Sequence, residues 1–165
     1  MKITYLSGND VREPVEAGSV NLILHCCNDI NLMGAGVARA LFEQWPEVKS
    51  KYHYAFEHNK NNKLGDVHFA KVEANIYVGN IIGQHTISTN KDGGPPIRYW
   101  AIDKAFKSIV RSIEKRDEEV VVNIPYLMGC DLAGGRWEEI EYLINKNFTN
   151  NSILVYVYDL FRKRG

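Results

Sequence analysis

The sequence carries no excess of charge of either sign. Its 165 residues include 20 Lys plus Arg and 20 Asp plus Glu, so the formal net charge is zero when the histidines are neutral. A protein that binds long nucleic acids by neutralising many phosphates would show a basic excess or a basic face. We therefore expect no long nucleic acid and no anionic membrane surface among the partners of this chain.

Long apolar runs and cysteines are also scarce. No run approaches the roughly 20 apolar residues that cross a bilayer, and residues 1–5 turn polar too early for a signal peptide. The three cysteines, Cys26, Cys27 and Cys130, leave an odd thiol in any pairing and lack the C-x-x-C spacing of zinc sites. We expect a protein of the reducing cytoplasm, or of the nucleus in a eukaryote, with no metal and no cofactor. Cys130 fits a small packing residue better than a nucleophile.

What the sequence does contain is an alternation of short β-rich runs with segments of helical period, which is typical of an α/β domain. The runs 20–27 and 120–125 are almost continuously apolar, as expected of central strands covered on both faces, whereas 66–72 alternates like an edge strand. Without a repeat or a linker, residues 1–165 are expected to form a single domain. Strands are expected at 2–6, 20–27, 66–72, 75–82, 120–125 and 153–158, and helices at 36–45, 48–56, 102–113 and 137–148.

Two glycine-bearing turns follow the two central strands, and each leads into an expected helix. The first spans 28–38 with Gly34 and Gly36, and the second spans 129–137 with three glycines. Glycine lets the backbone approach a ligand closely, and the first turn of a helix has N–H groups without intrahelical partners. One such turn is as often only a tight turn, but two at matching junctions favour a phosphate or diphosphate ligand. Neither has the pattern of a dinucleotide fingerprint or an ATPase phosphate loop.

The longest irregular stretch, 84–96, follows the carboxyl end of an expected strand, where open α/β sheets place their ligands. A loop of this length inside a compact domain is usually functional or mobile. It carries Asn90 and Asp92 as weaker candidates for the site.

Several of these motifs together resemble a macro domain, the ADP-ribose-binding module. The branch they resemble contains ADP-ribose 1''-phosphate phosphatase and terminal ADP-ribose protein glycohydrolase. The resemblance implies a three-layer α/β/α fold with a mixed, mostly parallel sheet, and a monomer whose partner is ADP-ribose or ADP-ribose 1''-phosphate. It extends over residues 2–160, and the motifs lie at 8–10, 25–28, 33–38, 80–85, 93–99 and 129–137.

The resemblance also implies where each part of the ligand is held. Adenosine would lie near the end of the first strand, where Asn9 replaces the usual aspartate and Asp10 follows it. Asn28 would face the distal ribose. The diphosphate and distal ribose would lie against the backbone of Met33, Gly34, Ala35, Gly36, Val37, Gly129, Cys130, Leu132, Ala133, Gly134 and Gly135.

The two activities of this branch differ in the groups they require. The glycohydrolase forms a lysyl intermediate with a lysine after the fourth strand and an aspartate in the second loop, and the resemblance places these at Gln84 and Ala133. Because a glutamine amide is no amine nucleophile, we expect hydrolysis of ADP-ribose 1''-phosphate to ADP-ribose and phosphate instead. The alternatives are a non-catalytic ADP-ribose reader and a hydrolase that removes ADP-ribose from a macromolecule.

Phosphate removal needs an activated water, a proton donor and groups that stabilise developing charge. The expected catalytic residues are Asn28, His25, His85 and Asp131. Each also has a purely structural interpretation: a turn cap for Asn28, a buried hydrogen-bonded side chain for His25, a solvated loop residue for His85, and a hydrogen bond within its own loop for Asp131.

Overall fold

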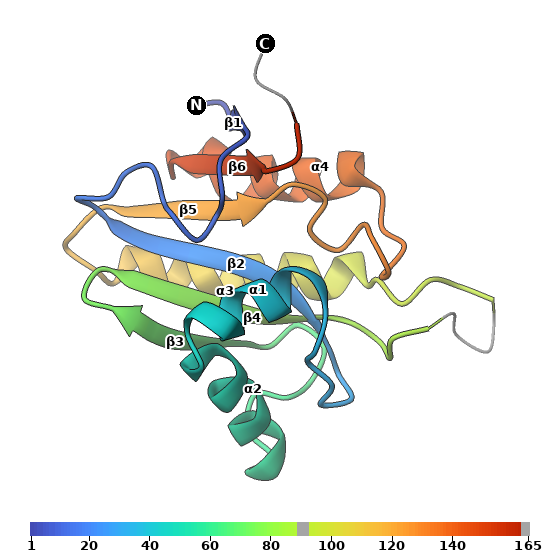
Figure 1. Cartoon of the computed structure of the whole chain (residues 1–165). Coiled ribbons are helices and arrows are strands. Elements are labelled where there is room, and N and C mark those ends of the chain that lie inside the picture. The colour runs from blue at the N-terminus through green and yellow to red at the C-terminus, as the bar shows by residue number, and fades with distance from the viewer. Residues whose placement is uncertain (89–92, 163–165) are drawn as a thin grey trace.

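The computed structural model describes residues 1–88 and 93–162, and the candidates Asn90 and Asp92 lie outside these ranges. Within them the elements follow the expected order, so the expected α/β class is confirmed (Figure 1). The strands are β1 (Thr4–Ser7), β2 (Val20–Asn28), β3 (Val67–Glu73), β4 (Ile76–Gln84), β5 (Val120–Pro125) and β6 (Val155–Asp159). The helices are α1 (Gly36–Gln44), α2 (Glu47–Glu57), α3 (Tyr99–Glu114) and α4 (Trp137–Asn147), followed by a 3-10 turn, η1 (Thr149–Asn151).

The strands of the described residues form one sheet in the order β1-β6-β5-β2-β4-β3. All neighbours pair in parallel except β3, which pairs antiparallel with β4 at the edge. The apolar strands β2 and β5 lie at the centre of this order, and helices cover both faces of the sheet there. Burial on both faces explains why their sequences are almost continuously apolar. The sheet is therefore mixed and mostly parallel, as expected.

Each face of the sheet has its own apolar core. Helices α1 and α2 lie on one face and α3 and α4 on the other (Figure 1). Leu41, Val48 and Tyr52 are buried between α1, α2 and the first face, whereas Phe106 and Ile140 belong to the core under α3 and α4. These side chains recur at helical spacing, so each helix presents one apolar stripe to the sheet. No helix of the described residues is long and apolar enough to cross a membrane.

A row of buried polar side chains interrupts the core beneath α2. The strand register places Asn80 of β4 beside His25 of β2 and His68 of β3. The Asn80 amide donates to the carbonyl of Val48 over 3.0 Å, so its own carbonyl accepts from Nε2–H of His25. Both ring nitrogens of His68 lack a hydrogen-bond partner within residues 1–88 and 93–162. Burial lowers the pKa of each histidine to about 4.

Acid should therefore destabilise the fold through these two histidines. An unfolded histidine has a pKa near 6.5, whereas the folded pKa of His25 and His68 is about 4, so the unfolded chain binds protons first. Their contribution to stability is present above pH ~6.5 and is lost as the pH falls toward 4. We expect His68→Leu to reduce the loss of unfolding free energy between pH 7 and pH 4 by about 2–3 kcal/mol, measured by urea unfolding.

The matched control for this experiment is His58→Leu, at an exposed histidine after α2. It should lose as much unfolding free energy as the wild type over the same pH range. If the two variants lose equal amounts, the buried row is not the source of the acid sensitivity.

Candidate functional site

A cleft of about 730 Å³ opens at the carboxyl ends of the parallel strands. This is where open α/β sheets hold their ligands, because the connecting loops gather at that edge. Its walls come from segments far apart in the sequence, namely 10–12 after β1, the end of β2, the start of α1, Gln84 of β4 and the loops after β5 and β6. The lining residues are 10–12, 25–26, 35–38, 40–41, 84, 125–129, 131–133 and 158–161.

The wall formed by residues 35–38 follows a tight turn that Asn28 holds. The Oδ1 atom of Asn28 accepts from the backbone N–H groups of Ile30 (3.1 Å) and Leu32 (3.3 Å), and its amide donates to the Leu32 carbonyl over 2.6 Å. The Tyr52 hydroxyl donates to the same Oδ1 over 2.6 Å. Asn28 is buried and does not line the cleft. Its contacts are those of a turn cap, and its expected role at the distal ribose stays a prediction.

The turn delivers the start of α1 to the cleft. Gly36 has φ of +62°, a conformation that glycine adopts without strain. The first backbone bond at this helix end runs from Arg39 N–H to the Ala35 carbonyl over 3.3 Å, so the N–H groups of Gly36, Val37 and Ala38 project beyond the helix. All three residues line the cleft.

The opposite wall is the loop between β5 and α4. Backbone bonds from Gly135 to Gly129 (2.9 Å) and from Gly134 to Asp131 (3.0 Å) fold it back on itself. A Cβ at Gly135 would lie 2.4 Å from the Gly129 carbonyl oxygen, so this close approach requires glycine. Within residues 1–88 and 93–162, the N–H groups of 131–133 have no acceptor. The second loop therefore presents a run of backbone donors, as the first does.

A carboxylate and a guanidinium meet at the β1 end of the cleft. Arg12 donates from Nε and Nη2 to Asp10, with Nη2 to Oδ2 at 2.6 Å, and its backbone N–H donates to Oδ1 over 2.9 Å. The hydrogen bonds from Arg12 hold the pKa of the Asp10 carboxyl below its usual value. The segment is fixed from below by Tyr158, whose hydroxyl accepts from the Val15 N–H over 3.0 Å.

The other expected catalytic residues have different surroundings. His25 lies 2% exposed at the cleft floor and is neutral at pH 7, because burial lowers its pKa to about 4. His85 is half-exposed outside the cleft lining, with Nδ1 2.7 Å from Oδ2 of Asp29. Asp131 is an exposed carboxylate on the cleft wall. The structure thus brings His25 and Asp131 to the cleft, and their catalytic roles stay predictions.

The expected ligand residues divide in the same way. Those on the cleft wall are Asp10, Ala35, Gly36, Val37, Gly129, Leu132 and Ala133. The others, which belong to the same loops without lining the cleft, are Asn9, Met33, Gly34, Cys130, Gly134 and Gly135.

The cysteines near the cleft are poor nucleophiles. Burial raises the pKa of Cys26 to about 12 and that of Cys130 to about 11, so both are thiols near neutral pH. Within the described residues, no three His, Cys, Asp or Glu side chains group closely enough to hold a metal ion.

Sequence reasoning missed several side chains of the cleft, among them Arg12, Tyr126 and Phe161. Arg12 could not be predicted because no sequence motif marks it, and only its contact with Asp10 in the structure places it at the cleft. Tyr126 and Phe161 follow β5 and β6, and Phe161 is 92% exposed. An aromatic residue just past a strand that ends at the ligand edge is a signal that would have found both.

Comparison with known proteins gives a family. The sequence matches no family model and no curated protein. Among solved structures, a protein of unknown function from Bacteroides thetaiotaomicron is 36% identical with a TM-score of 0.91, over 97% of this chain and 99% of that one. The macrodomain protein from Streptomyces coelicolor is 32% identical with a TM-score of 0.80, over 96% of this chain and 99% of that one.

A more distant structure, Thermosipho africanus DarTG in complex with ADP-ribose, is 18% identical with a TM-score of 0.68. The match spans 87% of this chain and 39% of the Thermosipho chain. At this sequence identity it shows a shared fold alone. The Streptomyces protein matches this chain over nearly its whole length, and its sequence identity of 32% shows that the two are homologous. On that ground, and as its sequence motifs led us to expect, the chain belongs to the macrodomain family.

Proposed function

We propose that the cleft binds ADP-ribose and that the chain hydrolyses ADP-ribose 1''-phosphate to ADP-ribose and phosphate. The observation that carries this proposal is two runs of backbone N–H groups without a backbone acceptor in the described residues, at 36–38 and at 131–133, whose residues all line one cleft of about 730 Å³. Oriented N–H groups at a helix start and in a folded loop bind phosphate without side-chain charge. A diphosphate between them would explain how a chain of zero net charge holds a polyanion.

The relatives support the nature of the ligand. The Thermosipho protein was solved with ADP-ribose, and the 39% of it that this chain matches has the same fold. With the diphosphate between the two loops, adenosine would extend toward Asp10 and Arg12 at the end of β1, and the distal ribose toward the turn held by Asn28.

The hydrolysis would use Asp131, the carboxylate exposed on the cleft wall beside the second donor group. A water attacks phosphorus and gives a proton to Asp131, while the bond between phosphorus and the 1''-oxygen breaks. The 1''-oxygen then takes up that proton, and the backbone N–H groups of the loop stabilise the charge on the phosphoryl oxygens.

The lysyl route for removing ADP-ribose from a macromolecule lacks its nucleophile. Gln84 lines the cleft at the position where the resemblance places the lysine, and its Nε2 donates to the Thr86 carbonyl over 2.9 Å. Ala133 stands at the position of the aspartate and is buried. The proposal therefore favours phosphate release over glycohydrolysis.

Disturbing the first donor group should weaken ligand binding. Gly36→Val places a branched side chain at φ of +62° beside the cleft, which disturbs the start of α1. We expect the affinity for ADP-ribose, measured by calorimetry, to fall at least about tenfold. Gly18→Val is the control because Gly18 also has open space around its Cβ position but lies in the connection before β2. Equal affinities in the two variants would exclude the first loop from the binding site.

Removing the exposed ring after β6 should weaken binding at the adenosine end. Phe161 lines the cleft and is 92% exposed, so an adenine that stacks on it gains contact that the free protein lacks. Base stacking on an aromatic ring contributes about 1–3 kcal/mol, so we expect Phe161→Ala to lower the ADP-ribose affinity by about 5- to 150-fold. Tyr142→Ala, at an exposed ring on α4, should leave it unchanged. The same affinity in both variants would place adenine elsewhere.

The reaction itself is tested by phosphate release from ADP-ribose 1''-phosphate. Asp131→Asn should lower the rate at least about 100-fold with ADP-ribose affinity retained, because the amide cannot take the proton of water. Asp117→Asn, at an exposed aspartate between α3 and β5, is the control and should keep the wild-type rate. An unchanged rate in Asp131→Asn would remove this residue from the mechanism. A wild-type chain that binds ADP-ribose and releases no phosphate would be a reader rather than a hydrolase.

A further inference from the structure

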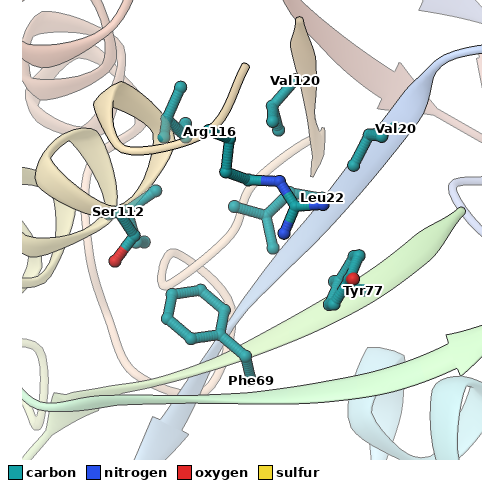
Figure 2. Close-up of a pocket in the computed structure, with 9 residues that line it drawn as sticks. Val20, Leu22, Phe69, Tyr77, Ser112, Arg116 and Val120 are labelled. Atoms are coloured by element: carbon teal, nitrogen blue, oxygen red, sulfur yellow. The ribbon is translucent and has the colours of Figure 1, made fainter. Parts of the chain in front are cut away.

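A second hollow, of about 200 Å³, lies at the end of the sheet opposite the cleft (Figure 2). Val20 and Val120 line it and are the first residues of β2 and β5, whereas the cleft is lined by the later residues His25, Cys26 and Pro125 of these strands and by the loops that follow them. On β2 the nearest lining residues of the two sites are Leu22 and His25, which are about 10 Å apart at a rise of about 3.3 Å per residue. We name this hollow the sheet-end pocket; its lining includes Leu22, Phe69, Tyr77, Ser112, Arg116 and Val120.

The walls of the sheet-end pocket are mostly apolar and come from the sheet and from α3. Leu22 and Val120 are buried members of the core, whereas Phe69 and Tyr77 pack against that core and remain partly exposed. Figure 2 shows the Phe69 and Tyr77 rings on one side and the last turns of α3, which carry Ser112, on another. Apolar walls around an open space forgo dispersion contacts that a ligand would supply. An engineered apolar cavity of about 150 Å³ binds benzene, so this volume accommodates one six-membered ring.

The charges at the pocket are arranged for a single negative charge. The Arg116 guanidinium lies 5.2 Å over the Tyr77 ring, and Lys71 Nζ lies 5.7 Å from the same ring centre. Glu118 accepts from Nε of Arg116 over 2.8 Å. A guanidinium has five N–H donors, so donors remain after this bond for a second carboxylate. Lys71 lies beside the pocket and not in its lining. Together with Arg116 and Glu118 it leaves one net positive charge around Tyr77, which suits a monoanion better than a phosphate dianion.

We propose that the sheet-end pocket binds a small aromatic monocarboxylate. The ring lies among the apolar side chains of β2, β4 and β5, and the carboxylate accepts from Arg116 at the mouth. This site is independent of the ADP-ribose cleft, because the two share no lining residue.

Phenylacetate is the probe that tests this site. Its binding is measured by the amide chemical shifts in nuclear magnetic resonance spectra of the whole chain. We expect saturable shifts at the amides of Val20, Leu22 and Val120, with millimolar affinity. The uncharged alcohol 2-phenylethanol should bind about tenfold more weakly, because it cannot pair with the guanidinium. No saturable shift with phenylacetate up to about 20 mM would overturn the proposal, and so would equal affinity for the alcohol.

Two substitutions separate the charge from the space. Arg116→Gln should lower the affinity for phenylacetate about tenfold. Arg111→Gln, at an exposed arginine of α3 that does not line the pocket, should not. Ser112→Phe fills the pocket from the surface of α3 and should abolish binding. All three variants should bind ADP-ribose as the wild type does, which reports that they are folded. Equal phenylacetate affinities of the two glutamine variants would overturn the proposal.

Discussion

The parallel pairing of β2 with both β4 and β5 is the constraint on which the rest of the structure depends. Because these strands run in one direction, their carboxyl ends and the loops that follow them meet at one edge of the sheet. The two glycine turns are about 100 positions apart in the sequence, yet they form opposite walls of one cleft. The sheet thus brings together two runs of backbone donors that lie far apart in the sequence.

The polar side chains at this edge are largely occupied by the fold itself. Asn28 caps the first turn, and His25 donates to Asn80 under α2. His25 is neutral at physiological pH, since protonating it would place a charge in the core. The groups left to meet a ligand are backbone N–H groups, the Asp10–Arg12 pair and Asp131. A site of this kind recognises its ligand by the shape and direction of its donors rather than by charge.

The sequence predicts the fold and part of the site, for physical reasons that particular residues make clear. Strands β2 and β5 were predictable because burial on both faces demands nearly continuous apolar runs, and the edge position of β3 followed from its alternation. The loops were predictable because glycine clusters mark special backbone conformations, and Gly36 and Gly129 indeed have positive φ.

Side-chain pairings, by contrast, depend on distances that no sequence pattern contains. The contact between Asp10 and Arg12 is local, but the segment that carries it is also held by a hydrogen bond from the Val15 N–H to the hydroxyl of Tyr158 on β6, which no local pattern contains. The same holds for His25. Its catalytic and its structural interpretation differ only in which group the imidazole ring hydrogen-bonds, a ligand or another side chain. The partner is Asn80 on the neighbouring strand, 55 positions away, and the register that pairs them is set by the whole sheet.

The opposite ends of the sheet also differ in the donors they offer, and strand direction is the reason. At the carboxyl end the chain leaves β2 and β5 through glycine loops into helix starts, so unpaired N–H groups gather there. At the amino end the chain enters these strands from the end of α3 and from the segment before β2, so no helix start is available there among the described residues. An anion at this end must be bound by side chains, and the guanidinium of Arg116 supplies the charge-assisted donors. A diphosphate suits the first end because it needs many donors, whereas a carboxylate suits the second because it needs one planar fork.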